Sequence, residues 1–385
     1  MNDAWLLPEY IEDILPPYAR QAEFLRRRLL DLFDTYGYEL VWPPMLEYLD
    51  SLLTGTAGDL DLKTFKVVDA LSGRMMGVRA DITPQMARID AHLLNRQGVA
   101  RLCYAGSVLH TQPDGLLAAR EPYQVGAELF GHPGIEADRE ILSLLLASLN
   151  AARLGEFRVS LGHVGLFRAL VAAAGVTRAT ERPLFRALRS KDVPALAQLT
   201  HDLSEPWRNA FLVLPELYGG PAVIAEAREQ LPGVPGVLRA LDDLAALMAS
   251  HPGMDFAVDL SDLRGFGYHT GVVFAAYVGG QAQSVAVGGR YDGTGAVFGR
   301  ARPATGFSLD LRRLLLSLPE PRLRTGILAP SAGEPGLEER VAELRAGGER
   351  VVVELPGQGE HRLEAGCDRH LVFDGGTWKI KPLYS

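Results

Sequence analysis

The chain has 385 residues, of which 47% are hydrophobic and 22% are charged, and its formal net charge is −8. This composition is typical of an ordinary soluble globular protein with two or three compact units. No run approaches the roughly eighteen apolar residues that a membrane span needs, and the N-terminus lacks the pattern of a signal peptide, so we expect a cytoplasmic protein without a membrane partner.

The net charge and the cysteine count argue against a nucleic-acid partner and a cysteine metal cluster, respectively. A net charge of −8 provides no global attraction for a polyanion, which is weak evidence against nucleic acid as the main partner. Cys103 and Cys367 are far apart in the sequence and too few for a metal cluster. We therefore predict that both cysteines are inert core residues of a protein in a reducing compartment.

The N-terminal region predicts a long helix, a strand and a hairpin. Apolar residues within 18–36 recur at alternating steps of four and three, which places them on one helical face. Gly37 ends this helix, and the aromatic and apolar run 38–42 predicts a strand closed by two prolines. Two short strands are expected within residues 65–79, on either side of a Ser-Gly turn.

The central region predicts a pair of strands followed by a block of helices. Residues 84–94 are expected to form a helix, and residues 101–109 and 123–129 to form two antiparallel strands joined by a polar loop. From about 166 to 250 the sequence is rich in alanine, leucine, arginine and glutamate at helical spacing. Because this stretch separates two strand-rich blocks, we predict that it is an inserted helical domain.

Strands resume at residues 254–260 and 272–278, and a last amphipathic helix is expected at 309–318. Helices that alternate with antiparallel strands, rather than regular strand-helix-strand units, indicate an α+β core. We expect this core, including the helical insertion, to occupy residues 1–320.

The remaining residues, 321–385, predict a small C-terminal α/β unit. Its expected elements are strands at 326–329, 351–355 and 369–373 and a helix at 337–345. Such a unit is short for a complete domain, so we expect a reduced one.

Four segments of the chain carry a resemblance to a known family. They are residues 37–44 (Gly-Tyr-Glu-Leu-Val-Trp-Pro-Pro), 79–85 (Arg-Ala-Asp-Ile-Thr-Pro-Gln), 104–131, and 264–313, which include Arg-Gly-Phe-Gly-Tyr-His-Thr-Gly at 264–271 and Gly-Gly-Arg-Tyr-Asp-Gly at 288–293. Each alone is a weak indication, because short motifs are common by chance. In this order they resemble the core of a class II aminoacyl-tRNA synthetase of the histidyl type. The resemblance implies an antiparallel sheet flanked by helices.

The ATP side of the resembling site departs from the synthetases. Where that family carries an arginine on the ATP α-phosphate and a glutamate two residues later, this chain has His110 and Gln112. A second arginine corresponds to Ala118, and a glycine close to the adenine corresponds to Asp310, although Arg313 keeps the family's arginine. A neutral imidazole cannot replace a bidentate guanidinium at phosphorus, and a carboxylate repels a nucleotide. The sequence therefore predicts that adenylation is lost.

The amino-acid side of the site keeps the family's pattern. The resemblance assigns to a histidine pocket the residues Asp81, Thr83, Gln124, Glu128, Arg264, Tyr268 and His269. Acids would meet the ligand's ammonium group, the arginine its carboxylate, and polar or aromatic groups its ring. Gln124 and Glu128 are an even number of residues apart on a predicted strand, so their side chains share one face, as a pocket floor requires. On this basis we expect histidine binding without catalysis.

These residues also have plainer interpretations. Taken alone, Gln124 and Glu128 would more often be solvent-facing strand residues, and Tyr268 an aromatic residue of the core. The histidines have no neighbours at metal-ligand spacing, so we expect neither a metal nor another cofactor. The arginines at 26–28 lie on a helix with a defined apolar face, which favours a solvated surface over a phosphate site.

The departures together resemble the regulatory subunit family of ATP phosphoribosyltransferase, the enzyme that opens histidine biosynthesis. This resemblance implies a non-catalytic subunit with a homodimeric core, which binds a separate short-form catalytic subunit and reports L-histidine levels through the retained pocket. The short C-terminal region, with Glu338, Glu339 and Glu343, resembles a remnant of an anticodon-binding domain and predicts no tRNA partner. The alternative is an active histidyl-tRNA synthetase-like aminoacyl ligase, in which Arg120 or Arg88 would supply the α-phosphate contact.

Overall fold

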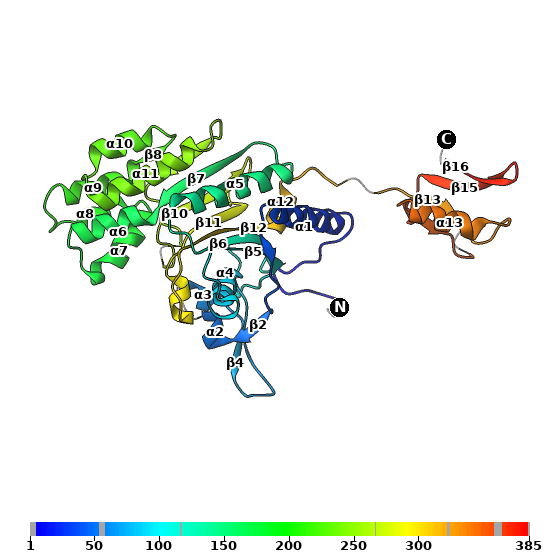
Figure 1. Ribbon diagram of the computed structural model, residues 1–385, viewed down its shortest axis with the longest axis horizontal. Helices are drawn as coiled ribbons and strands as arrows, with labels where there is room; N and C mark the ends of the chain where they lie inside the picture. The colour runs from blue at the N-terminus through cyan, green and yellow to red at the C-terminus, as the bar shows by residue number, and fades with distance from the viewer. Residues whose placement is uncertain are drawn as a thin grey trace. The chain divides into compact units, whose positions relative to one another are not determined.

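The computed structural model describes residues 5–53, 58–115, 118–265, 267–321, 324–357 and 364–383. The chain divides into two compact units, Met1–Leu318 and Pro319–Ser385. Figure 1 shows a large sheet with helices packed against it in the first unit, and a small sheet with one labelled helix in the second. Among the helices of the described ranges, none combines the length and apolarity that crossing a membrane requires.

The first unit is built on a nine-stranded sheet in the order β1-β5-β6-β12-β11-β10-β7-β9-β8. Its strands are β1 (Glu39–Leu40), β5 (Ala100–Ser107), β6 (Tyr123–Phe130), β7 (Phe157–His163), β8 (Tyr218–Gly219), β9 (Phe256–Asp259), β10 (Val272–Val278), β11 (Ala286–Arg290) and β12 (Ala304–Asp310). The pairs β1–β5 and β7–β9 are parallel, and the other neighbours are antiparallel. The predicted α+β architecture is confirmed, with a sheet that is mixed instead of wholly antiparallel.

One face of this sheet is covered by three helices. They are α1 (Tyr18–Thr35), α5 (Ile135–Ala151) and α12 (Leu311–Leu316). Leu29, on the predicted apolar face, is fully buried, and so is Phe33, which was not assigned to that face; the predicted Tyr36 is exposed. The Phe33 ring meets the ring of Phe307 from β12 edge-on, with 5.9 Å between centroids. Apolar burial of this kind holds α1 against the middle of the sheet.

The opposite face of the sheet carries a second apolar cluster. It includes Ile82, just before α4 (Thr83–Arg88), and Met86 within that helix, which continues as the π-helical segment η1 (Ile89–Leu94). Leu102 and Tyr104 of β5 belong to this cluster, while Cys103 between them belongs to the core under α1. This alternation separates a helix-covered face from a face that is free to form a site.

Both cysteines are buried, as predicted. Burial raises the pKa of Cys103 to about 12. A thiol with such a pKa stays protonated at neutral pH and is a poor nucleophile.

The chain between β1 and β5 forms a smaller three-stranded sheet in the order β2-β4-β3. Its elements are β2 (Leu46–Tyr48), β3 (Lys66–Val68) and β4 (Met75–Val78), and it is accompanied by the short helices α2 (Leu49–Leu53) and α3 (Gly58–Lys63). β3 and β4 form the predicted hairpin, and Gly73 adopts a left-handed φ of 69° in the turn between them.

Helices fill the stretch between β7 and β9, and they lie together at one end of the first unit (Figure 1). They are α6 (Val164–Ala173), α7 (Arg178–Arg189), α8 (Val193–Leu199), α9 (Trp207–Val213), the 3-10 segment η2 (Leu214–Glu216), α10 (Val223–Gln230) and α11 (Pro235–Ala249). Phe167 of α6 and Phe211 of α9 are fully buried and meet edge-on. This group therefore has its own apolar interior, continuous with the main core.

The helix predicted at 309–318 begins two residues later than expected. Leu309 and Asp310 belong to β12, where they pair with β6. The Asp310 carboxylate then accepts hydrogen bonds from the backbone N–H groups of Arg312 and Arg313, so it caps α12. Neither β12 nor β11 was predicted, because glycines interrupt the apolar alternation in both. The 3-10 segment η3 (Thr294–Phe298) lies between them.

The second unit has a four-stranded sheet in the order β14-β13-β15-β16 and one described α-helix. Its elements are β13 (Ile327–Ala329), α13 (Leu337–Ala346), β14 (Val351–Val353), β15 (Arg369–Asp374) and β16 (Thr377–Pro382). β13 is parallel to both β14 and β15, and β16 returns antiparallel to β15. The three predicted strands and the predicted helix are present, and β16 is an addition.

Candidate functional site

A pocket of about 50 Å³ lies over β6, β11 and β12. It is lined by the predicted residues Asp81, Thr83, Gln124, Glu128, Tyr268 and His269, and also by Val287, Gly288, Gly289, Tyr291, Gly306, Phe307 and Ser308. Six of the seven predicted site residues are therefore brought together from well-separated parts of the chain. The seventh, Arg264, does not line it.

Glu128 is the most deeply placed acid of the pocket, with 1% of its surface exposed. It pairs with Gly306 across β6 and β12. A Cβ atom at position 306 would lie only 1.6 Å from a carboxylate oxygen of Glu128, so a glycine is required there. The carboxylate accepts hydrogen bonds from the hydroxyls of Thr83 (3.0 Å), Tyr104 (3.3 Å) and Tyr291.

The charge of Glu128 is poorly compensated by its surroundings. Burial raises its pKa to about 8, and the nearby Asp81 carboxylate acts in the same direction. The hydrogen bonds from Tyr291 and Thr83 oppose this rise but do not overcome it. In the described part of the chain no arginine or lysine forms an ion pair with Glu128. A cationic group entering the pocket would therefore meet the Asp81 carboxylate and would favour ionisation of Glu128.

Asp81 and Gln124 are held together by side-chain hydrogen bonds. The Gln124 amide donates to Oδ1 of Asp81 (3.2 Å), and its carbonyl oxygen accepts from the backbone N–H of Ile82 (3.0 Å). Oδ1 of Asp81 also accepts from the backbone N–H of Thr83 (3.2 Å). These bonds fix the segment that leads into α4, so Gln124 positions the pocket wall and is not simply a solvent-facing strand residue.

Tyr268 and His269 form an aromatic wall, with 4.0 Å between ring centroids. Nδ1 of His269 lies 3.1 Å from the carbonyl oxygen of Arg290, which can only accept, so Nδ1 carries the hydrogen. Burial, together with the positive charges of Arg264 and Arg168, lowers the pKa of His269 to about 4. The ring is therefore neutral, and its Nε2 can accept a hydrogen bond from a ligand N–H group.

Arg264 faces other partners. Its Nε donates to the Asp262 carboxylate at 2.8 Å, and its Nη2 donates to the Tyr277 hydroxyl at 3.1 Å. These bonds hold the guanidinium against Asp262 and Tyr277, neither of which lines the pocket. Phe266, two residues further along the predicted motif, lies outside the described residues.

The ATP side of the site is occupied by contacts within the protein. Nε2 of His110 lies 2.9 Å from the carbonyl oxygen of Ala80, so this imidazole is used in the fold. Arg313 forms an ion pair with Asp310, with 3.1 Å between Nε and Oδ2, and its Nη1 donates to the carbonyl oxygen of Ser284. The arginine that the synthetases use for ATP is thus neutralised by the residue that replaces their glycine.

The two arginines of the alternative hypothesis are also engaged. Arg88 forms an ion pair with Glu47. Arg120 donates from Nε to the carbonyl oxygen of His110 (3.1 Å), and its guanidinium lies 5.2 Å from the centre of the Phe65 ring. Neither arginine is therefore available as it stands for an α-phosphate.

The sequence did not point to three residues that surround the Glu128 carboxylate. Tyr291 and Tyr104 bind Glu128, and Gly306 makes room for it. Both tyrosines lie within the resembling segments, at 288–293 and at the start of 104–131, so the motifs contained a signal that was not used. Gly306 lies in a strand that was not predicted.

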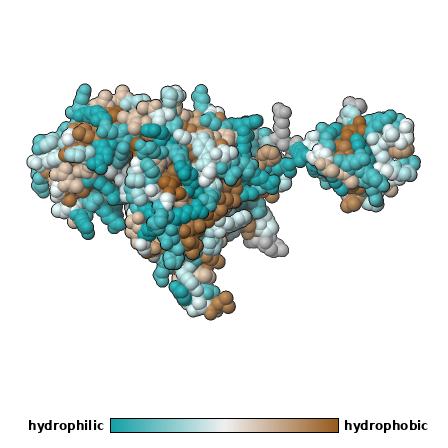
Figure 2. Space-filling model, in the orientation of Figure 1, coloured by the Kyte–Doolittle hydropathy of each residue, from teal (hydrophilic) through white to brown (hydrophobic). Residues whose placement is uncertain are grey.

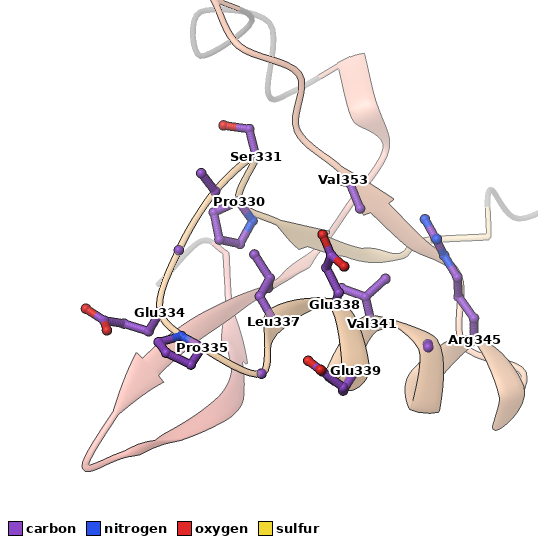
Figure 3. A pocket seen from close by; sticks show the side chains of 14 residues that line it. Pro330, Ser331, Glu334, Pro335, Leu337, Glu338, Glu339, Val341, Arg345 and Val353 are labelled. Atoms are coloured by element: carbon purple, nitrogen blue, oxygen red, sulfur yellow. The ribbon is translucent and has the colours of Figure 1, made fainter.

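A larger hollow of about 670 Å³ lies in the second unit, at the carboxyl ends of β13 and β14 and the start of α13. Figure 3 shows Glu334, Glu338 and Glu339 around it, with Arg345 at one side. Arg345 donates to the carbonyl oxygen of Val351 (3.0 Å). Three carboxylates against one arginine make this hollow unfavourable for a phosphate group. The described residues contain no group of three His, Cys, Asp or Glu side chains arranged to hold a metal ion.

Comparison with known proteins first defines the class. The profile of the histidyl-tRNA synthetase family matches residues 10–314. The crystal structure of histidyl-tRNA synthetase from Nostoc sp. PCC 7120 superposes with a TM-score of 0.80, over 98% of this chain and 95% of that chain, at 16% identity. At that identity the match establishes the fold alone. The chain therefore has the fold of the histidyl-type class II synthetases.

More similar proteins then define the family. A structure from Bacillus halodurans, titled as an ATP phosphoribosyltransferase regulatory subunit/histidyl-tRNA synthetase, has a TM-score of 0.81 and 28% identity over 92% of this chain and 93% of that chain. The ATP phosphoribosyltransferase regulatory subunit of Ralstonia nicotianae is 59% identical over 98% of both chains. The C-terminal domain profile of ATP phosphoribosyltransferase subunit HisZ matches residues 324–381. The chain belongs to the ATP phosphoribosyltransferase regulatory subunit family.

Proposed function

We propose that this chain is a non-catalytic cytoplasmic subunit that holds a separate short-form catalytic chain of ATP phosphoribosyltransferase in an active assembly, in the first step of histidine biosynthesis. The observation that carries the proposal is a contrast within one site. The amino-acid side keeps a built pocket around Glu128, whereas on the ATP side Arg313 is paired with Asp310. Activation of an amino acid by ATP requires both the amino-acid side and the ATP side of the site.

L-histidine is the ligand that this pocket favours. The Asp81 carboxylate and Glu128, which an ammonium group would induce to ionise, suit the ligand's ammonium group, and the neutral Nε2 of His269 suits an imidazole N–H. Small-molecule pockets usually exceed about 300 Å³, well above the about 50 Å³ of this one. Binding therefore requires the pocket to widen, which gives histidine a means of favouring one state of the assembly.

A tRNA partner is not part of this proposal. The profile match at 324–381 and the compact unit from Pro319 onward support a reduced C-terminal domain at 321–385, beside a core at 1–320 with a helical insertion at 166–250. Three carboxylates and one arginine line the hollow of that C-terminal domain, and their excess negative charge repels a phosphate backbone.

A homodimeric core is expected from the edge of the large sheet. Among the described strands β1 pairs only with β5, and Leu40 of β1 and nearby Trp42 are 55% and 83% exposed. Figure 2 shows hydrophobic residues along the lower part of the first unit, down to the tip of the hairpin of β3 and β4. Trp42→Asp should convert the dimer to a monomer in sedimentation velocity, because it places a charge within the apolar contact.

The matched control for the dimer is Tyr218→Asp, which introduces the same charge at the opposite edge of the same sheet. Tyr218 is 61% exposed on β8, so the dimer should persist in this variant. A wild-type chain that sediments as a monomer at micromolar concentration would contradict the expectation.

Reconstitution tests the proposed function directly. Phosphoribosyl transfer from phosphoribosyl pyrophosphate to ATP is measured for the catalytic chain alone, for this chain alone and for the mixture. We expect a large increase in the mixture and background activity for this chain alone, including in pyrophosphate exchange with histidine and ATP. A catalytic chain whose activity does not change on mixing, or robust exchange by this chain, would refute the proposal.

A further inference from the structure

Helix α7 carries arginines on one side only. The arginine stripe consists of Arg178, Arg182, Arg186 and Arg189. At about 100° per residue, steps of four, four and three residues place these side chains within an arc of about 80° and along about 16 Å of the helix. All four are exposed. α7 lies at the lower left border of the first unit in the view of Figure 1.

Nothing within the described residues neutralises this stripe: none of its arginines forms an ion pair there. By contrast, Arg26 and Arg27 on α1, which the sequence suggested as a basic cluster, both bind Glu23. Like charges four residues apart destabilise a helix, and Arg178 also faces the positive end of the helix dipole. A row of charges that weakens its own helix points to a partner outside the chain.

Helix α7 is also connected to the pocket wall. Nη2 of Arg168, on α6, donates to the backbone carbonyl oxygen of His269 at 3.0 Å. The negative charge of Glu181, on α7, opposes the lowering of the Arg168 pKa by burial, so the two groups attract each other. An electrostatic attraction and one hydrogen bond therefore link the stripe's helix to a residue that lines the pocket.

We propose that the arginine stripe of α7 is a docking surface for an acidic face of the catalytic subunit. The inference rests on the proposed function, since it names the surface through which the two chains would meet. Guanidinium groups bind carboxylates through two parallel hydrogen bonds, and arginine is enriched in protein interfaces where lysine is depleted. A rigid helix holds the stripe in one geometry, which limits the entropy lost on docking.

The composition of the stripe favours a protein over a nucleic acid. It contains arginine without lysine, and Ala179 and Pro183 provide small apolar surface beside it. Single-stranded nucleic acids are usually bound by exposed aromatic side chains next to basic ones, and Phe185, the aromatic residue of α7, is half-buried. The net charge of −8 also opposes a polyanion over the rest of the surface.

The test compares two double charge reversals of equal net charge. Arg182→Glu/Arg186→Glu alters the stripe, and Arg28→Glu/Arg239→Glu alters exposed arginines on α1 and α11. Binding of each variant to the immobilised catalytic subunit is measured by surface plasmon resonance at low and high ionic strength. Thermal melts establish folding, and Arg182→Gln/Arg186→Gln replaces the reversal if that variant does not fold.

We expect the stripe variant to bind at least about tenfold more weakly, with slower association and less sensitivity to salt, while the control variant behaves as the wild type. Equal affinity of both folded variants, in an assembly that is still activated, overturns the docking proposal and leaves the proposed function intact. A wild-type chain that neither binds nor activates the catalytic subunit would instead remove the proposed function. Stripe-dependent binding to bulk tRNA, without an effect on the catalytic subunit, would also overturn the proposal.

Discussion

A Glu128→Gln variant is expected to be more stable than the wild type at about pH 8, and this advantage should vanish toward about pH 5. In the unfolded chain this carboxyl ionises near 4.5, whereas burial raises its pKa in the folded protein to about 8. The folded state therefore binds more protons between these values. The stability contributed by neutral Glu128 is complete below about 4.5 and is lost as the pH rises to about 8. Since each pKa unit corresponds to about 1.4 kcal/mol, the loss is on the order of a few kcal/mol.

Urea unfolding of both proteins across this pH range measures the effect. The glutamine amide offers a donor and an acceptor, as the neutral carboxyl group does, so the hydroxyls of Tyr104 and Tyr291 keep partners. Glu23→Gln is the control: hydrogen bonds from Arg26 and Arg27 lower the pKa of Glu23 to about 2, so it stays ionised throughout the window. A difference between Glu128→Gln and the wild type that does not change with pH would contradict the expectation.

The elements with a clear period could be predicted from the sequence. The apolar spacing of residues 18–36 gave a helix because every third or fourth side chain must face the same core. Even spacing along a strand likewise placed Gln124 and Glu128 on one face, and both line the pocket. The other predicted pocket residues, Asp81, Thr83, Tyr268 and His269, came from the resemblance, because the spacing of its motifs is not specified by local physics.

The contacts between distant strands could not be predicted. Glu128 has room for its side chain because its partner across β6 and β12 is Gly306, which has no Cβ atom. Which residues of two strands lie opposite each other cannot be read from the sequence of either strand alone. β11 and β12 themselves contain glycines where an apolar alternation would otherwise indicate a strand.

Two predicted roles changed when side-chain partners became visible. Asp310 was expected to repel a nucleotide, and the structure adds that it caps α12 and pairs with Arg313. Arg264 was expected to face the pocket, but Asp262, only two residues away, holds its guanidinium. A sequence pattern assigns a residue type to a place, whereas the direction of a long side chain depends on which nearby charge it meets.

Histidine binding should be weakened about ten- to hundredfold by Glu128→Ala, which corresponds to a loss of roughly 1.5–3 kcal/mol for one charge-assisted contact. An ammonium group stabilises the ionised form of Glu128, so binding below about pH 8 should release a proton. Calorimetry in buffers of different ionisation enthalpy measures both the affinity and this proton release. Glu128→Gln should bind histidine weakly and without the release.

Arg264→Ala tests the other end of the ligand. We expect weaker histidine binding in this variant, because the positive charge of Arg264, which does not line the pocket itself, acts on His269, which does. Arg239→Ala, which removes an exposed arginine from α11, should leave the affinity unchanged. In the assembled enzyme, Glu128→Ala and Arg264→Ala should reduce feedback by histidine. The binding measurement is decisive, because the catalytic chain can carry its own histidine site. If the wild-type chain binds no histidine, with or without its partner, the proposed histidine pocket is refuted and its residues are only retained parts of the synthetase fold.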